Sequence, residues 1–302
     1  MADTRITLGG VPRSEFTHPG TSRGLLDVFR WHYLLQLLVQ TGVTTRYRNS
    51  VLGWTWSYVR PAAQFLVFWV VLGIFLSLHN NIANYAIYLF SGIVVINLFS
   101  EAFKNATTSI VGNAPLVRKV YLPRQLFAVS AAIVAFVHFL PQLVLLLVVC
   151  AVLGWFAHVT VLGVLAILAG MVIIMLFALG AGLFFGAINV RFRDAENIVE
   201  LLLMLATWAS PVLYYWTMVQ HALPGWMVRL YLINPITQAV ELFHYGFWRA
   251  VTEGTDPGRL GEFPIPPDLA INTLWALLIS LATIMIGQWV FRSLEGRFAQ
   301  DL

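Results

Sequence analysis

Six apolar runs, each long enough to cross a lipid bilayer, dominate this sequence and limit the folds that it can adopt. A helix needs roughly twenty apolar residues to span the hydrocarbon core of a membrane. Hydrophobic residues make up 59% of the 302 residues and charged residues only 11%, far from the composition of a soluble domain. We therefore expect an all-α membrane protein with six transmembrane helices. The predicted spans lie near 61–79, 84–104, 125–151, 160–188, 198–218 and 268–291.

The distribution of Lys and Arg predicts which side of the membrane each loop faces. Seven cations precede the first span, four lie in 104–124, and two each lie in 189–197 and after residue 291. The 219–267 segment carries three, and the two short connections carry none. Fifteen of the eighteen cations therefore share one side if both termini are cytoplasmic, as the positive-inside rule requires. We expect an N-in, C-in topology.

The chain before the first span divides into two predicted parts. Residues 1–22 are polar, contain no apolar signal-peptide core, and are expected to form a flexible cytoplasmic tail. Residues 23–60 combine an amphipathic helix over 24–41, placed in the membrane interface, with a basic and aromatic ramp into the membrane. The remainder, 61–302, is interpreted as one transmembrane domain.

The 219–267 segment is apolar, but proline and glycine divide it into pieces too short to span a membrane. We expect two short helices that re-enter the outer leaflet and satisfy their backbone groups against the helical bundle. The alternative is a globular extracytoplasmic loop, which would have to bury five large aromatic side chains. These are Trp226, Tyr231, Phe243, Tyr245 and Trp248.

A short basic segment, 113–125, separates the second and third spans. Pro115 and Pro123 limit it to one or two helical turns. One interpretation is an ordinary positive-inside loop, and the other is a helix that docks in a groove of a partner protein. In the second interpretation the docking residues are Leu116, Val117, Arg118, Lys119, Tyr121, Pro123 and Arg124.

Motifs for nucleotide or metal chemistry are missing from the sequence. Its two lysines, Lys104 and Lys119, do not follow a glycine, so the chain has no P-loop. Its seven histidines are dispersed, and its single cysteine, Cys150, lies in an apolar run. We expect no metal site, no bound cofactor, no disulfide and no catalytic residue on this chain. Gly182 and Gly186 are interpreted as a close contact between two helices.

Few ionisable residues fall within the predicted spans. Asn97, Glu101 and Lys104 share one face of the second span, where Glu101 and Lys104 can pair locally and anchor the end of the helix. An ion site is the less favoured alternative. His138 in the third span is expected to hydrogen-bond a neighbouring helix rather than to relay protons. The shortage of intramembrane carboxylates argues against a proton- or sodium-driven pump.

Aromatic residues form a stripe on the first span and recur on the fifth. The residues concerned are Tyr58, Phe65, Phe68 and Trp69, followed by Trp208 and Tyr215. Most such residues belong to interfacial belts or face lipid. The alternative is a passage for sugars, because the apolar faces of sugar rings stack on aromatic planes.

Four pieces of sequence, in order along this frame, carry a family resemblance. They are Tyr47-Arg-Asn-Ser-Val-Leu-Gly-Trp-Thr-Trp56 with Pro61, Val117-Arg-Lys-Val-Tyr-Leu-Pro-Arg124, Asn189-Val-Arg-Phe-Arg-Asp194, and Asn234-Pro235. Together they resemble the transmembrane subunits of ABC-2-type exporters for lipid-linked polysaccharides, including O-antigen, capsule and teichoic-acid exporters. The resemblance covers nearly the whole chain.

The resemblance implies a homodimer in the bacterial inner or plasma membrane that binds two copies of a separate ATPase subunit. That partner would hold ATP and Mg²⁺, and no nucleic acid is involved. Residues 116–124 would be the main coupling helix, the N-terminal amphipathic helix a second ATPase contact, and the polymer would pass between the protomers. The implied cytoplasmic ramp or gate comprises Arg46, Tyr47, Arg48, Ser50, Gly53, Trp56 and Pro61, and the implied cytoplasmic loop contains Arg191, Arg193 and Asp194.

Two other classes of protein fit parts of the pattern. An ABC-2 permease for a drug or small lipid usually carries a larger extracytoplasmic domain, and the N-terminal ramp argues against it. A membrane-embedded glycosyltransferase needs an acidic motif in an aqueous loop. Asp194, Glu196 and Glu200 follow a basic pair at the end of a span, so we interpret them as the start of a cytoplasmic helix. Sixteen Arg against two Lys, with abundant Ala and Val, indicates a high-GC genome. For an actinobacterial source, the resemblance implies a lipid-linked cell-wall galactan as the polymer, because family members there export one.

Overall fold

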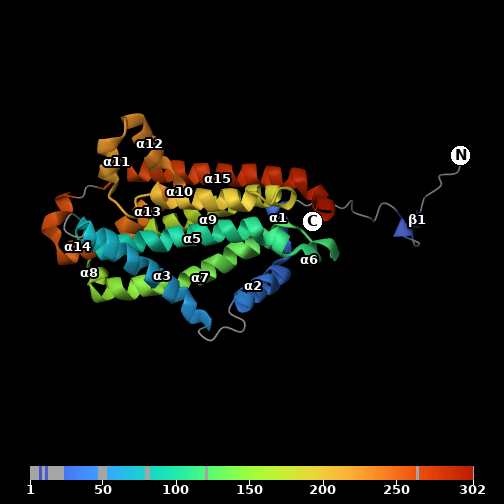
Figure 1. Cartoon of the computed structure of the whole chain (residues 1–302), viewed down its shortest axis with the longest axis horizontal. Helices are drawn as coiled ribbons and strands as arrows, with labels where there is room; N and C mark the ends of the chain where they lie inside the picture. The colour runs from blue at the N-terminus through green and yellow to red at the C-terminus, as the bar shows by residue number, and fades with distance from the viewer. Residues whose placement is uncertain are drawn as a thin grey trace.

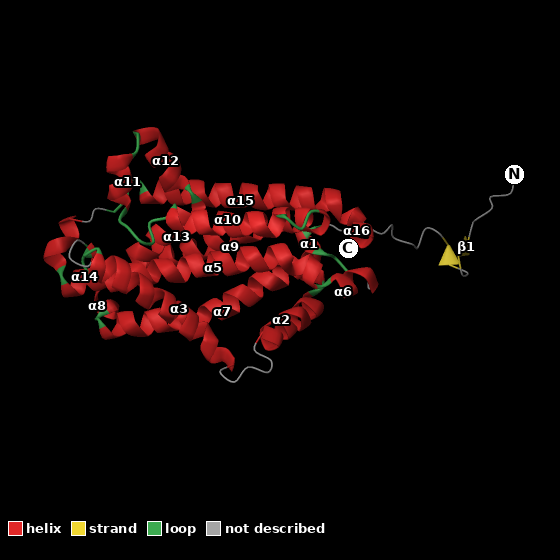
Figure 2. Cartoon of the chain, viewed as in Figure 1, coloured by secondary structure: helices red, strands yellow, loops and turns green. Residues whose placement is uncertain are grey.

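The computed structural model describes residues 7–8, 11–12, 24–46, 53–78, 82–119, 122–262 and 265–301. These residues are almost entirely helical (Figure 2), which confirms the all-α prediction. One exception is a two-residue antiparallel pairing of β1 (Thr7–Leu8) with β2 (Val11–Pro12). The rest of the predicted tail, 1–22, lies outside the described residues.

Five helices in the described part of the chain are long and apolar enough to cross a membrane. Figure 1 shows most of them side by side along the long axis of the molecule, with the first running obliquely. Their bounds agree with five of the six predicted spans to within several residues. They are α3 (Trp56–Phe68) with its π-helical continuation η3 (Trp69–Phe75), α5 (Tyr85–Gly112), α7 (Gln125–Val152), α9 (Val161–Arg191) and α15 (Leu269–Leu294).

The predicted fifth span, 198–218, is not one continuous helix. Its helix α10 (Ala195–Trp208) has 14 residues and is therefore about 21 Å long, shorter than a hydrocarbon core of about 30 Å. Pro211 disfavours a helical conformation at the residue before it, and the chain turns there before α11 (Trp216–Ala222) begins. The predicted span ran past this break because the residues on both sides of it are apolar. Six spans and the N-in, C-in topology stay predictions.

The 219–267 segment contains α12 (Gly225–Ile233) and α13 (Pro235–Phe243) where two short helices were predicted. The second is longer than predicted, because the helical conformation continues from α13 without a break to Thr255. Asn234 begins α13, since its side chain accepts a hydrogen bond from the N–H of Ile236 (3.0 Å) and Pro235 takes the first helical position. Every residue of α13 is buried among α5, α9 and α15. Re-entry of this pair into a membrane stays a prediction. The segment continues through η4 (His244–Trp248), α14 (Arg249–Thr255) and η5 (Pro257–Glu262).

The remaining short elements gather at the two ends of the bundle. In Figure 1, α8 (Trp155–His158) lies with α11, α12 and α14 at one end. The opposite end carries the C-terminus and the elements α1 (Leu25–Arg30), α2 (His32–Arg46), α6 (Ala114–Lys119), η6 (Glu295–Arg297) and α16 (Phe298–Asp301). The cationic loops therefore meet at one end, as the predicted topology requires.

The predicted interface helix over 24–41 is split into α1 and α2 at Trp31. Helix α2 lies against α7, where a Cβ on Gly42 would come within 2.8 Å of Val134. Its other side is open, with Tyr33 75% and Leu37 48% exposed. A face with exposed aromatic and apolar side chains is typical of a helix that lies in the membrane interface.

Small residues bring α9 into direct contact with two neighbouring helices. A Cβ on Gly182 would collide with the Cβ of Ala106 on α5, and one on Gly186 would lie 3.2 Å from the Ala106 carbonyl oxygen. On another side, a Cβ on Gly180 would lie 2.6 Å from the backbone nitrogen of Ile284 on α15. Close backbone approach of this kind drives helix association in lipid through dispersion. The predicted role of Gly182 and Gly186 is confirmed.

Candidate functional site

A polar cavity of about 660 Å³ lies between α3, α5 and α7, with Leu203 of α10 on its wall. Its polar lining follows from helical spacing, because residues three or four positions apart share a face. On each helix such a face points into the cavity. The residues concerned are Arg60 and Gln64 on α3, Asn97, Glu101 and Lys104 on α5, and His138 and Gln142 on α7.

Two polar contacts join α5 to α7 at the cavity. The Glu101 Oε1 atom lies 2.6 Å from His138 Nδ1, and the Asn97 side-chain amide donates to Gln142 Oε1 at 3.4 Å. The His138 side chain is only 2% exposed and that of Glu101 19%. A buried polar group costs free energy unless it is hydrogen-bonded, so these pairings make a polar site tolerable between apolar helices. The predicted hydrogen bond from His138 to a neighbouring helix is confirmed.

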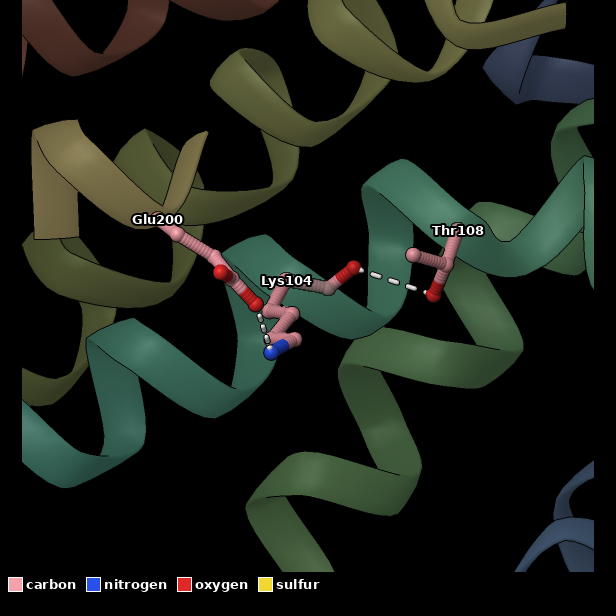
Figure 3. A network of polar contacts seen from close by, with 3 residues as sticks. All are labelled: Lys104, Thr108 and Glu200. Atoms are coloured by element: carbon pink, nitrogen blue, oxygen red, sulfur yellow. Dashed lines mark hydrogen bonds and ion pairs between the residues drawn. The ribbon is translucent and has the colours of Figure 1, made fainter. Parts of the chain in front are cut away.

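The predicted local pair of Glu101 with Lys104 is wrong. Lys104 instead reaches α10, where its Nζ lies 2.6 Å from Glu200 Oε1 (Figure 3), while Glu101 contacts α7. Thr108 donates to the backbone carbonyl of Lys104 at 3.1 Å, which is a bond within α5 (Figure 3). The spacing on α5 allowed a local pair, but the acid on α10 and the histidine on α7 are better placed. The Lys104 and Glu200 side chains are 53% and 58% exposed, so their ion pair lies at the rim of the cavity.

The predicted ramp is partly described. The first span begins at Trp56, five residues before the predicted start at Pro61. The helix can run through this proline because only one helical hydrogen bond is removed, the one to the Ser57 carbonyl. Ser57 itself lines the cavity. Arg60 lies with its guanidinium carbon 5.9 Å from the Trp56 ring centre, a cation–π contact at the cavity wall. Gly53 belongs to the preceding turn η2 (Gly53–Thr55). Tyr47, Arg48, Ser50 and the side chain of Arg46 lie outside the described residues.

The predicted coupling helix differs in its bounds from the expected 116–124. Helix α6 begins at Ala114, where the Asn113 carbonyl accepts from the N–H groups of Leu116 and Val117 (3.0 and 3.1 Å). It is described as far as Lys119, and residues 122–124 are not helical. Pro123 disfavours a helical conformation at the residue before it, and α7 begins only at Gln125. Tyr121 lies outside the described residues.

Helix α6 has a buried side and an exposed side. Val117 is 6% exposed and belongs to an apolar cluster with Phe298 of α16, whereas Leu116 is 42% exposed. Arg118 and Lys119 are exposed. Arg124 lies with its guanidinium carbon 5.5 Å from the Phe298 ring centre, so it supports the C-terminal helix. Sequence reasoning missed this support, although an isolated aromatic residue in the polar tail after 291 was a signal for it.

The predicted aromatic passage residues do not share one surface of the protomer. Phe65 packs edge-to-face on Phe90 of α5 (ring centres 5.4 Å apart). Phe68 and Trp69 also pack against the apolar core. Tyr58 and Trp208 are exposed (38% and 58%), while Tyr215 is 4% exposed and contacts the rings of Tyr88 and Trp248. A role of these six residues in sugar passage stays a prediction.

The predicted cytoplasmic loop follows the end of α9. Arg191, Arg193 and Asp194 are all exposed, and α10 begins directly after them. Glu196 in the first turn accepts a hydrogen bond from the buried side chain of Asn189 (2.8 Å). An acidic residue in the first turn is favourable beside the helix N-terminus. The interpretation of this acidic cluster as a helix start is confirmed.

Comparison with known proteins places these features in a family. The model of the ABC-2 type transporter family matches residues 33–248, which include α3, α5, α7 and α10 and therefore the whole cavity. The O-antigen export system permease protein RfbA of Myxococcus xanthus is 31% identical over 278 residues, which cover 91% of this chain and 98% of that relative.

More distant relatives have related names. An O-antigen export system permease protein RfbA of Klebsiella pneumoniae is 28% identical over 212 residues (69% of this chain, 78% of that relative). The polysialic acid transport protein KpsM of Escherichia coli is 21% identical over 255 residues (84% and 90%). The family model and the Myxococcus relative both cover most of the sequence. The chain therefore belongs to the ABC-2 type transporter family, and its relatives are permeases for polysaccharides.

Proposed function

We propose that this chain is the membrane permease subunit of an ATP-driven exporter that moves a lipid-linked polysaccharide across the bacterial inner or plasma membrane. The observation that carries the proposal is the nearly full-length similarity to an O-antigen export permease. Relatives named for polysialic acid and capsule polysaccharide support the same substrate class. The polymer is an O-antigen-like glycan, a teichoic acid or a cell-wall galactan.

The exposed side of α6 is the proposed contact for a separate ATPase subunit, which binds ATP and Mg²⁺. Exposed Leu116 offers an apolar side chain and exposed Arg118 and Lys119 offer two cationic ones, while buried Val117 anchors the helix to the bundle. A movement of the ATPase pair would push α6 and, through the short connections on either side, the rigid helices α5 and α7. Two ATPase copies would serve a homodimer of this chain, with both termini in the cytoplasm and the polymer passing between the protomers.

The acidic residues that a glycosyltransferase would need are engaged in contacts between structural elements. Glu196 accepts from Asn189, and Glu200 pairs with Lys104 of α5. Glu196 therefore has a structural role at the start of α10, and Glu200 is already paired with a cation. They support the permease function over a membrane-embedded glycosyltransferase.

Co-purification tests the proposed ATPase contact. The tagged chain, extracted from its own membranes, should bring down a stoichiometric ATPase subunit. Arg118→Glu combined with Lys119→Glu should lose that subunit, because both side chains are exposed at the proposed contact. Arg124 is left unchanged because it supports Phe298. The matched control is Arg229→Glu on α12, an exposed cation at the opposite end of the bundle, which should retain the ATPase. A chain that purifies intact without any ATPase contradicts the proposal.

A further inference from the structure

We propose that the polar cavity between α3, α5 and α7 binds one or two sugar units of the exported polymer within each protomer. This inference rests on the proposed function, because it takes the substrate to be a glycan. The six aromatic residues that the sequence predicted for a sugar passage do not line this cavity. The inference is therefore separate from that prediction. The argument depends on the size of the cavity, the chemistry of its lining and the charges that are already paired.

The size of the cavity suits a small polar ligand. Its volume of about 660 Å³ falls in the range of about 300–1,000 Å³ that is usual for small-molecule sites. It lies beside Asn97, Glu101 and Lys104, in the half of α5 (Tyr85–Gly112) that leads toward α6. A polymer arriving from the α6 end would therefore reach this cavity before it reaches α13 at the other end of the bundle (Figure 1).

The lining combines groups that recognise hydroxyls. The amide side chains of Gln64, Asn97 and Gln142 each offer both donors and acceptors, and a sugar hydroxyl can satisfy either. Asn97 and Gln142 already bond each other at 3.4 Å, which leaves further donor and acceptor capacity on both amides. Trp56 adds an aromatic plane, 38% exposed, at the end of α3 on the same wall. Amide groups beside an aromatic plane match a ring that has polar edges and apolar faces.

The charges of the cavity argue against a metal ion as its ligand, and its amides argue against an acyl chain. Glu101 is the only carboxylate of the lining and lies 2.6 Å from His138, so a cation would find one oxygen ligand group. The lining also holds two cations: Lys104 lies 2.6 Å from Glu200, which offsets its charge, and Arg60 contacts the Trp56 ring. An acyl chain would leave the amides and charges without water or partners. A neutral polyhydroxyl ligand conflicts with none of these groups.

Site-directed photo-crosslinking tests the inference with the native polymer as the probe. A photoreactive amino acid replaces Leu203, the apolar residue of the cavity wall, so that the polar lining stays intact. The whole complex is illuminated in inverted membrane vesicles depleted of ATP, where polymer is stalled. We expect tagged adducts of high mass that collapse on periodate treatment. The matched control carries the same amino acid at Met285 on α15, which is 66% exposed and lies outside the cavity, and should give phospholipid adducts alone.

A second variant separates binding from structural damage. Asn97→Leu combined with Gln142→Leu removes the amides but keeps side chains of similar size, and should lower the glycan adduct at position 203 by about tenfold. The ATPase should still co-purify, since α6 is unchanged. Phospholipid adducts alone at position 203, or glycan adducts undiminished by the double change, overturn the inference.

Deleting the gene for the chain distinguishes the two proposals. If the deletion strain loses its surface polysaccharide while position 203 captures only phospholipid, the sugar-binding cavity is wrong and the exporter stands. If the deletion strain keeps its surface polysaccharide unchanged, the exporter itself is wrong, and the cavity proposal fails with it.

Discussion

Helices α5 and α3 are nearly equally apolar, yet their surroundings differ completely. In the most apolar 18-residue stretch of each helix, 78% is buried inside the protein for α5, against 11% for α3 with its continuation η3. Helix α5 packs against α7, α9 and α13. Helix α3 touches α5 and α7, and Leu66 of α3 is 61% exposed and Phe75 of η3 74% exposed. Apolarity alone therefore reports the presence of a membrane, and only packing tells a central helix from a peripheral one. The polar cavity lies at the boundary between the two.

The largest expected effect comes from truncating a leucine on each helix. Leu89 on α5 is fully buried, so Leu89→Ala should destabilise the protein by about 2–5 kcal/mol through lost burial and a residual cavity. Leu66→Ala on α3 is the matched control, and its exposed side chain predicts a change within about 0.5 kcal/mol. Thermal unfolding of the purified chain in detergent measures both. Equal losses at the two positions would remove the distinction between a central and a peripheral helix.

Replacing a glycine by a larger residue tests whether α5 is the central helix. Gly182→Leu on α9 should cost about 1–3 kcal/mol, because the new side chain meets Ala106 of α5. Gly112→Leu, at the end of α5 with open space around it, should leave the unfolding temperature nearly unchanged. Comparison of the two melting curves checks this. A Gly182→Leu protein as stable as the original would mean that α5 and α9 do not meet here.

A comparable effect is expected where the cavity lies between α5 and α7. His138→Ala removes the side chain 2.6 Å from Glu101, so a partly buried carboxylate loses a polar contact and stability should fall by about 1–3 kcal/mol. The double change Glu101→Gln with His138→Gln places two neutral amides opposite each other, and it should recover part of the stability that His138→Ala loses. The test is a double-mutant cycle of unfolding free energies. Strict additivity would show that the two residues do not interact.

The smallest effect on stability is expected at the rim. Lys104→Glu places like charges at the exposed contact of α5 with α10, where solvent screens them, so the unfolding temperature should hardly move. Exchanging the pair, Lys104→Glu with Glu200→Lys, should behave as the original protein. A large loss of stability with Lys104→Glu, reversed by the exchange, would place this ion pair among the structural contacts instead.

Sequence patterns predicted what depends on single helices and missed what depends on their neighbours. The third span, predicted as 125–151, is α7 (Gln125–Val152), because composition and length suffice to locate such a helix. The shared face of Asn97, Glu101 and Lys104 was also visible in the spacing. Their partners were not, since His138 and Glu200 lie 37 and 96 residues further along the chain.

Proline accounts for two of the errors in the predicted bounds. Pro61 was given as the start of the first span, although the helix runs through it, and Pro211 was included in a span whose helix ends before it. A proline removes one hydrogen bond, and whether the helix continues depends on what donates to the freed carbonyl and where the chain must go next. Those conditions are set by tertiary contacts. They cannot be read from the residues next to the proline.

Surface polysaccharide in a strain that lacks this chain tests the central claim most directly. We expect the deletion strain to lose the polymer from its surface, to accumulate the lipid-linked polymer inside, and to recover export when the intact chain is supplied. The chain with Arg118→Glu and Lys119→Glu should fail to restore export although it reaches the membrane in normal amounts. Unchanged surface polysaccharide in the deletion strain would contradict the assignment of this protein as a polysaccharide export permease.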